Sequence, residues 1–433
     1  MTLPSPKPDK LKQINTIFYK FLWGNGPDKV KREIICQDYQ HGGLKMIEIH
    51  NFIKGLKVTW IRRLMKTENS PWFTLFENQI CTVKRLQTFG KLWICKILNK
   101  VRNPFWCDIL KIWQDVVDIN KVNSNIDILN SPIWYNHRLV EVYPFYLPNW
   151  YNSGIKFVHD VVKDCGKFLE FEEIKEKFNN GSLGLLEYYR LRGLINNYIA
   201  QNKLDNDFHH VKPFIPFDYK IVLKSKKGSQ DFYKLLTSKL KIPDVIGKWN
   251  SSLNTTYNVN IWKVIFKSCF LTLQDNNLKW FQFRLLHRIL GVNSLLYKMK
   301  ISDNHYCRLC NSNEETIVHL FVECQKSNKL WGEIKNWINK TVNVELNFTP
   351  TLILLGHINS DSNQIPINAI LMTVKYYIFN CAHLNKELDI FMCQKRVKNM
   401  YMEQQSLSLS LNQLPKFRKK WTKWEPMVTI QNE

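Results

Sequence analysis

Glycine and proline are scarce in this chain, with 16 of each among 433 residues. Because these two residues punctuate turns, their scarcity argues against a turn-rich β fold. No apolar run approaches the length that a membrane-spanning helix needs, and the first residues lack the apolar segment of a secretion signal. Hydrophobic residues still make up 45% of the chain, which is enough for a substantial core. The composition predicts a folded, mainly α, multi-helical protein without a membrane partner.

Acidic residues are also few, because 37 Asp and Glu stand against 61 Lys and Arg and leave a formal net charge of +24. Such an excess repels itself unless a polyanion is near, and nucleic acid is the commonest polyanion. The 15 tryptophans, 17 tyrosines and 25 phenylalanines add rings that could stack on unpaired bases, although a single ring more often belongs to the core. The charge therefore favours RNA or DNA as the partner.

Four residues in the C-terminal half have the spacing of a zinc site. Cys307, Cys310, His319 and Cys324 form the pattern C-x2-C-x8-H-x4-C. Three thiolates and one imidazole can close a tetrahedral Zn²⁺ site, and the metal then stabilises a unit too small to fold on its own core. The alternative is that these are ordinary cysteines, which usually behave as small core residues. Four protein ligands leave no open position, so we expect a structural Zn²⁺ in the unit 307–324.

Helical periodicity and changes in polarity divide the chain. Apolar residues recur at three- and four-residue steps, for example in the expected helices 10–23, 51–66 and 278–290. Polar loops interrupt this pattern after residue 201. We therefore expect four parts: a helical segment at 1–66, a helical linking domain at 67–201, a polar connector at 202–258, and a C-terminal helical domain at 259–433 that contains the zinc unit.

The expected helix at 278–290 carries a candidate nucleic-acid-binding face. Arg284, His287 and Arg288 lie at i, i+3 and i+4, opposite the apolar arc of that helix. Each arginine can bind a phosphate with two hydrogen bonds, and Trp280 near the same face could stack on a base. The alternative interpretation is that these charged residues simply form the solvated surface of a helix and bind no nucleic acid.

Two further basic sets are candidates for the same role. One lies on the expected helix at 51–66, where the long cations could instead cover apolar surface. The other lies near the C-terminus, where it could equally be a nuclear-localisation sequence or a disordered tail. The residues are Lys57, Arg62, Arg63 and Lys66 in the first set and Arg418, Lys419 and Lys420 in the second.

A series of short motifs runs along the chain. They are FLWGN at 21–25, SPIWYN at 131–136, KWFQFRLLHRIL at 279–290, and CRLC followed by ETIVHLFVEC at 307–324 with a trailing Trp331. In these motifs and their order, the chain resembles the C-terminal region of reverse transcriptases from non-LTR, LINE-type retrotransposons. The resemblance spans nearly the whole chain. It implies the end of a thumb, a linking region and a terminal Cys/His domain.

The resemblance also implies a function. In the family, these parts grip template RNA and target DNA during target-primed reverse transcription, so a ribonucleoprotein in the nucleus and cytoplasm is expected. Polymerase chemistry in the family needs adjacent aspartates that hold two metal ions, and no Asp-Asp pair occurs in this sequence. We therefore expect a truncated element or partial gene product that is not an enzyme by itself. Its expected partners are nucleic acid and the polymerase and endonuclease parts of the same element.

The alternative function is a zinc-stabilised helical module for protein interaction, derived from a retrotransposon and without a role in nucleic-acid binding.

Overall fold

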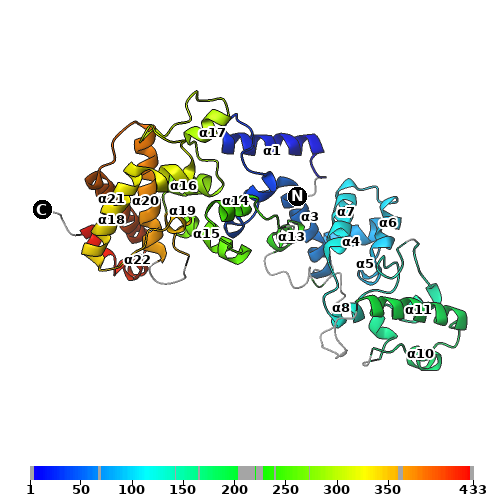
Figure 1. Cartoon of the computed structure of the whole chain (residues 1–433). Helices are drawn as coiled ribbons and strands as arrows, with labels where there is room; N and C mark the ends of the chain where they lie inside the picture. The colour runs from blue at the N-terminus through cyan, green and yellow to red at the C-terminus, as the bar shows by residue number, and fades with distance from the viewer. Residues whose placement is uncertain are drawn as a thin grey trace. The chain divides into compact units, whose positions relative to one another are not determined.

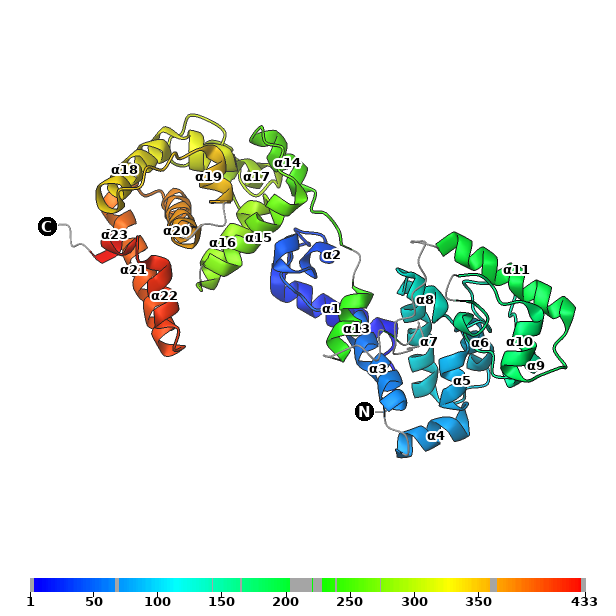
Figure 2. The same cartoon turned by 90° about the horizontal axis from the view of Figure 1, so that it is seen from below.

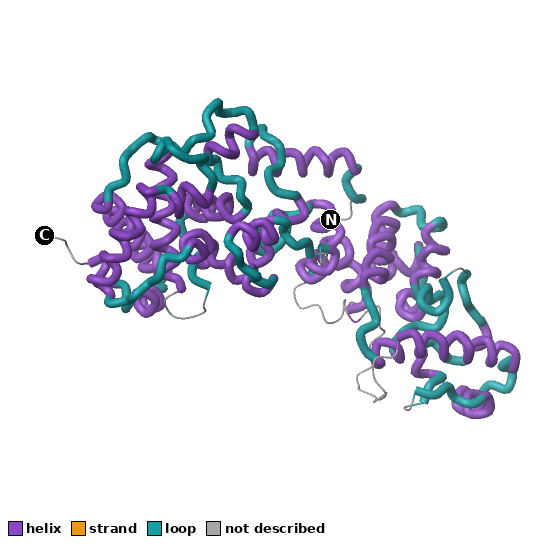
Figure 3. Tube along the Cα trace, in the orientation of Figure 1, coloured by secondary structure: helices purple, strands orange, loops and turns teal. Residues whose placement is uncertain are grey.

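The computed structural model describes residues 4–66, 70–141, 143–163, 166–202, 220, 228–237, 240–272, 274–358 and 364–429. Within these ranges the fold is mainly helical, and Figure 3 shows helices joined by loops. This part of the chain forms isolated β-bridges, such as Tyr306 with Glu314, but no β-strand. The predicted mainly α fold class is confirmed. None of the described helices is both long enough and apolar enough to cross a membrane.

The chain folds into two compact units (Figure 1). Unit 1 comprises Met1–Phe18 and Glu48–Lys239, and unit 2 comprises Tyr19–Ile47 and Leu240–Glu433. The four-part division expected from the sequence stays a prediction, and much of the polar connector at 202–258 lies outside the described residues.

Unit 1 is built of helices around an aromatic core in which α3 packs against α7 and α13. Its helices are α3 Ile49–Lys66, α4 Pro71–Gln79, α5 Val83–Thr88, α6 Lys91–Leu98, α7 Pro104–Ile119, α8 Asn125–Leu129, α9 Pro148–Asn152, η2 Val158–Asp160, α10 Phe171–Phe178, α11 Leu185–Asn202 and α13 Ser229–Leu236. Helix α1, Pro8–Trp23, begins in unit 1 and ends in unit 2.

Helix α7 shows how the local sequence builds unit 1. Asn103 caps the helix by accepting a hydrogen bond from the N–H of Phe105, and Pro104 occupies the first turn, where a missing N–H costs nothing. Buried residues at three- and four-residue steps, including Ile109, Trp113 and Val116, then form one continuous apolar face. This face lies in the same core as Trp60 of α3.

Unit 2 surrounds the long helix α20, which contacts α15, α16 and α21 (Figure 2). Its helices are α2 Arg32–Ile35, η1 Tyr39–His41, α14 Val245–Ser252, α15 Val259–Thr272, α16 Asn276–Leu286, α17 Asn293–Lys298, η4 His319–Glu323, α18 Gln325–Val342, α19 Pro350–Leu355, α20 Gln364–His383, α21 Ile390–Ser410, α22 Leu414–Trp421 and α23 Glu425–Thr429. The loop between α17 and η4 contributes Cys307 and Leu309 to the main core of this unit, together with Cys324. The Cys/His residues are therefore continuous with the core.

Candidate metal centre and basic surfaces

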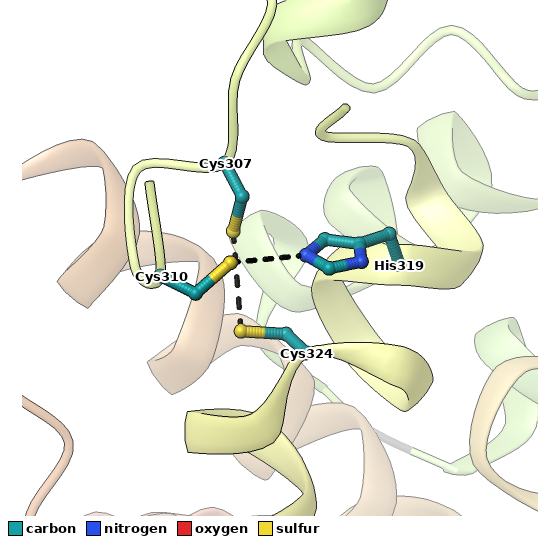
Figure 4. A group of neighbouring side chains, drawn as sticks. All are labelled: Cys307, Cys310, His319 and Cys324. Atoms are coloured by element: carbon teal, nitrogen blue, oxygen red, sulfur yellow. Dashed lines mark hydrogen bonds between the residues drawn. The ribbon is translucent and has the colours of Figure 1, made fainter. Parts of the chain in front are cut away.

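The four predicted metal ligands lie together in unit 2 (Figure 4). Their ligand atoms are all within 4.8 Å of one another. The Sγ atoms of Cys307 and Cys324 are 3.9 Å apart, and the Sγ of Cys310 is 3.4 Å from Nε2 of His319. In a tetrahedral site with Zn–S bonds of about 2.3 Å, the sulfur atoms are about 3.8 Å apart. The positions of the four atoms therefore fit a single Zn²⁺ ion.

A tight turn holds the first pair of cysteines. The N–H of Asn311 donates to the Cys307 carbonyl over 2.8 Å. Asn311 has a φ of 56°, a left-handed conformation that asparagine tolerates better than most residues. The N–H of Cys307 donates to the carbonyl of Asn313 at 2.8 Å and closes the loop. Main-chain hydrogen bonds thus hold both thiols in one small turn.

A π-helical turn, η4, brings the second pair together. The N–H of Cys324 donates to the carbonyl of His319, five residues earlier, over 2.8 Å. Cys324 is also the N-cap of α18. The thiol of Cys307 donates to the sulfur of Cys324 at 3.9 Å, and this hydrogen bond is the main reason that the pKa of Cys324 is lowered. The nearby main-chain N–H groups of Ser327 and Lys326 also lower the pKa of its thiol. The hydrogen bond from Cys307 therefore favours, at Cys324, the thiolate form that metal binding requires.

The donor set indicates which metal fits and what it would do. Cys307, Cys324 and His319 are buried, and Cys310 is half-buried. Three sulfur atoms and one imidazole nitrogen match the ligands that Zn²⁺ takes in closed structural sites. Because four protein ligands complete a tetrahedron, no position is left for a catalytic water. The cluster can hold zinc as a structural ion.

A buried ion pair, which the sequence reasoning missed, supports this cluster. Glu315 is fully buried and accepts hydrogen bonds from the N–H groups of Asn293 at 2.9 Å and Arg308 at 2.8 Å. The guanidinium of Arg308 also donates to both carboxylate oxygens, at 3.0 Å and 3.1 Å through Nε. The pair ties the cysteine turn to the start of α17. The sequence signal was an arginine between two candidate ligands and a glutamate shortly before the third.

The predicted basic face at 278–290 is not formed. Helix α16 ends at Leu286, where the N–H of Ile289 bonds to the carbonyl of Arg284 and Arg288 takes the left-handed conformation with φ 56°. This is the hydrogen-bond pattern of a helix C-terminus that turns the chain sharply. His287 is therefore buried instead of lying on a solvated face. The apolar periodicity of the sequence could not show where this helix ends, because a prediction from periodicity assumes that the helix continues.

His287 and Arg288 make contacts within unit 2 instead. Nε2 of His287 donates to the carbonyl of Gly42 at 2.8 Å, and burial lowers the pKa of His287 to about 4. Arg288 donates to the carbonyl of Lys248 at 3.1 Å and to Oγ of Ser252 at 2.7 Å. Its guanidinium also lies 4.8 Å from the centre of a ring of Trp249. Both side chains stabilise the fold.

The other two residues of this set are half-buried. Arg284 has a guanidinium 5.9 Å from the ring of Trp280, and its buried Nε has no hydrogen-bond partner among the described residues. Trp280 is stacked on Phe283, with an interplanar angle of 8°, and contacts Trp23. One face of this tryptophan is thus already used for packing.

The set on α3 divides between buried and exposed cations. Lys57 is buried and forms an ion pair with Asp108 at 2.8 Å, so it serves the interior of unit 1. Arg62 is half-buried, whereas Arg63 and Lys66 are exposed near the end of the helix. The guanidinium of Arg63 lies 4.5 Å from the centre of a ring of Trp60.

The C-terminal set lies on a folded helix. In α22, Phe417 and Trp421 are buried, whereas Arg418, Lys419 and Lys420 are exposed. Lys416, which the sequence reasoning did not select, is exposed too and lies one turn before Lys419 and Lys420. The alternative of a disordered tail does not apply to these residues. We call Lys416, Lys419 and Lys420 the α22 stripe.

One comparison with known protein families found a match. Residues 244–331 are similar to a family described as zinc-binding in reverse transcriptase. The matched segment contains all four residues of the metal cluster together with α14 to η4. Among curated proteins, no relative matched the chain. The family match supports a reverse-transcriptase-related zinc-binding region in this part of unit 2.

Proposed function

We propose that this chain is the non-catalytic, nucleic-acid-binding C-terminal part of a LINE-type reverse transcriptase, and that Zn²⁺ organises it. One observation carries the proposal. The segment similar to the zinc-binding family holds three thiols and one imidazole within 4.8 Å of one another. Bound Zn²⁺ would supply a structural cross-link between the cysteine turn and the start of α18.

The exposed cations support nucleic acid as the partner. The formal charge of +24 needs a polyanion to relieve its self-repulsion. With Lys57, His287 and Arg288 committed to contacts within the fold, we assign phosphate binding to the α22 stripe with Arg418 in unit 2 and to the exposed Lys66 in unit 1. Lysines one helical turn apart can neutralise neighbouring phosphates on a single strand.

We assign the polymerase reaction to another polypeptide segment. The sequence has no Asp-Asp pair that could hold the two metal ions of a polymerase. We therefore propose that the polymerase and endonuclease parts of the same element are its partners. A nucleotide-incorporation assay with the chain alone on a primed RNA template is expected to give no product.

The test is the salt dependence of RNA binding by the full chain. The variant Lys416→Gln with Lys419→Gln and Lys420→Gln removes the α22 stripe. Its affinity for a single-stranded RNA should fall, and the slope of log affinity against log salt should decrease by roughly 2, at about 0.7 for each phosphate contact.

A matched control separates local contacts from overall charge. Lys100, Lys121 and Lys298 are exposed lysines on three different segments, and their replacement by glutamine removes the same net charge. Their variant should keep most of the affinity and the slope. Equal losses in both variants would reject the α22 stripe as a binding surface. If the wild-type protein binds neither RNA nor DNA at low ionic strength, this result would reject the proposed function and favour a protein-interaction module.

A further inference from the structure

A cavity in unit 2, apart from the metal cluster, is lined mainly by aromatic rings. Its volume is about 470 Å³, within the usual range of small-ligand pockets. Its walls come from η1, the end of α15 and the first turns of α16. The lining includes Tyr39, Phe270, Asn276, Lys279, Trp280 and Phe283.

Two stacked ring pairs border this cavity. The rings of Tyr39 and Phe270 have centroids 3.9 Å apart and an interplanar angle of 13°. Those of Trp280 and Phe283 have centroids 5.3 Å apart and an angle of 8°. Phe283 is buried, whereas the other three rings are only partly buried. The cavity therefore presents flat, partly accessible rings backed by other rings.

The η1 turn is held firmly in place. A Cβ atom at Gly43 would lie 2.0 Å from the carbonyl oxygen of Gln37, so no larger residue fits there. Gly42 accepts the hydrogen bond from buried His287, which links this turn to the end of α16. These contacts fix the main chain of the turn that carries Tyr39.

The charge at the cavity is positive. Lys279 lines the cavity, and Nζ of Lys45 lies 4.7 Å from the ring centre of Tyr39. No carboxylate is among its lining residues in the described part of the chain. Lys45 forms an ion pair with Asp38 at 3.4 Å, so the positive charge that lines the cavity is that of Lys279. A ligand with a flat apolar group beside a negative charge is complementary to this site.

We propose that this cavity binds an unpaired nucleobase of a single strand, which stacks on Tyr39 or Trp280 while Lys279 contacts an adjacent phosphate. Stacking on aromatic rings beside a basic groove is the common way in which proteins hold single strands without reading sequence. The inference rests on the proposed function and makes it more specific, because it requires contacts to bases as well as to the backbone. An apolar peptide would gain nothing from the charge of Lys279.

The first experiment compares two probes with the full chain. One is a fluorescein-labelled decathymidylate, and the other has the same backbone with abasic tetrahydrofuran residues. The wild-type protein should bind the base-containing probe more tightly by roughly tenfold, the size of one base–aromatic stack. Tyr39→Leu should remove most of that difference. Tyr143→Leu, which truncates a 45% exposed tyrosine of unit 1, should preserve it.

The second experiment uses only the wild-type protein, so its result does not depend on whether a variant folds. Irradiation of the wild-type complex with an oligonucleotide that contains 5-iodouracil should cross-link the base to a peptide containing Tyr39, Phe270 or Trp280. Cross-links only elsewhere would overturn the cavity assignment. Equal affinity for the two probes would overturn the cavity assignment alone, since backbone binding would persist. Failure to bind either probe would reject the proposed function as well.

Discussion

Nζ of Lys375 lies 2.9 Å from Oε1 of Gln282, deep in the core of unit 2. The same ammonium group donates to the carbonyl of Leu354 at 3.1 Å. These two bonds join α20 to α16 and α19, at the centre of the unit that carries the metal cluster. Burial lowers the pKa of Lys375 to about 7, because the charged form is poorly solvated there. The core of unit 2 therefore contains an amine that titrates near neutral pH.

The stability of unit 2 should consequently depend on pH. Unfolded Lys375 keeps its proton up to a pKa of about 10.4, whereas the folded residue loses it at about 7. Between these values the unfolded state binds more protons, so the free energy of unfolding should rise with pH from about 7 to about 10. The measurement is the urea midpoint at pH 7 and pH 9. Lys375→Met should flatten this rise, whereas Lys340→Met, at an exposed lysine, should leave it unchanged.

Metal content tests the zinc cluster directly. Purified wild-type protein should contain about one Zn²⁺ per chain, and Cys310→Ser should lose it, since three ligands hold the ion much less tightly. The measurement is elemental analysis after dialysis against a weak chelator. Cys95→Ser, at an exposed cysteine of unit 1, should retain the metal. Wild-type protein without zinc would contradict the assignment.

The ion pair of Glu315 and Arg308 should control how firmly the cysteine turn is held. Glu315→Gln leaves the guanidinium of Arg308, whose side chain is only 14% exposed, without its charged partner. Removal of one member of such a pair costs roughly 3 kcal/mol of the free energy of unfolding. Chelator-induced release of zinc should also become faster. Glu314→Gln, at the exposed neighbouring carboxylate, should change neither quantity.

Arg288 should affect stability more than RNA binding. Arg288→Ala removes two hydrogen bonds and a ring contact, so thermal unfolding should occur at a lower temperature. Arg288→Lys keeps the charge but loses the planar fork, and it should remain destabilised. RNA affinity at low ionic strength, measured below the unfolding range, should be nearly unchanged in both. A loss of affinity in Arg288→Ala that Arg288→Lys restores would show that the charge contacts phosphate.

Local sequence patterns were enough to predict several features of the fold. The apolar periodicity of 10–23 and 51–66 predicted helices that the structure has at Pro8–Trp23 and Ile49–Lys66. The spacing from Cys307 to Cys324 predicted that four ligand atoms would meet, and they do. Short-range geometry makes this possible, because a tight turn and one helical turn bring both pairs of ligands together.

The prediction failed at 287–288, where the outcome depended on distant residues. The indole of Trp249 donates to the carbonyl of Leu286 at 2.8 Å, and Gly42 accepts from His287. Partners that are far away in sequence cannot be read from a helical pattern.

By itself, the sequence determined the helical class of this protein, its excess of positive charge and the grouping of three cysteines with one histidine. Each of these follows from composition or from contacts within a few residues. Only the tertiary structure decided which cations remain in solvent, which enter the core and which rings border a cavity. The reason is physical: the cost of burying a charge depends on the groups that surround it after folding, and many of those groups come from distant parts of the chain.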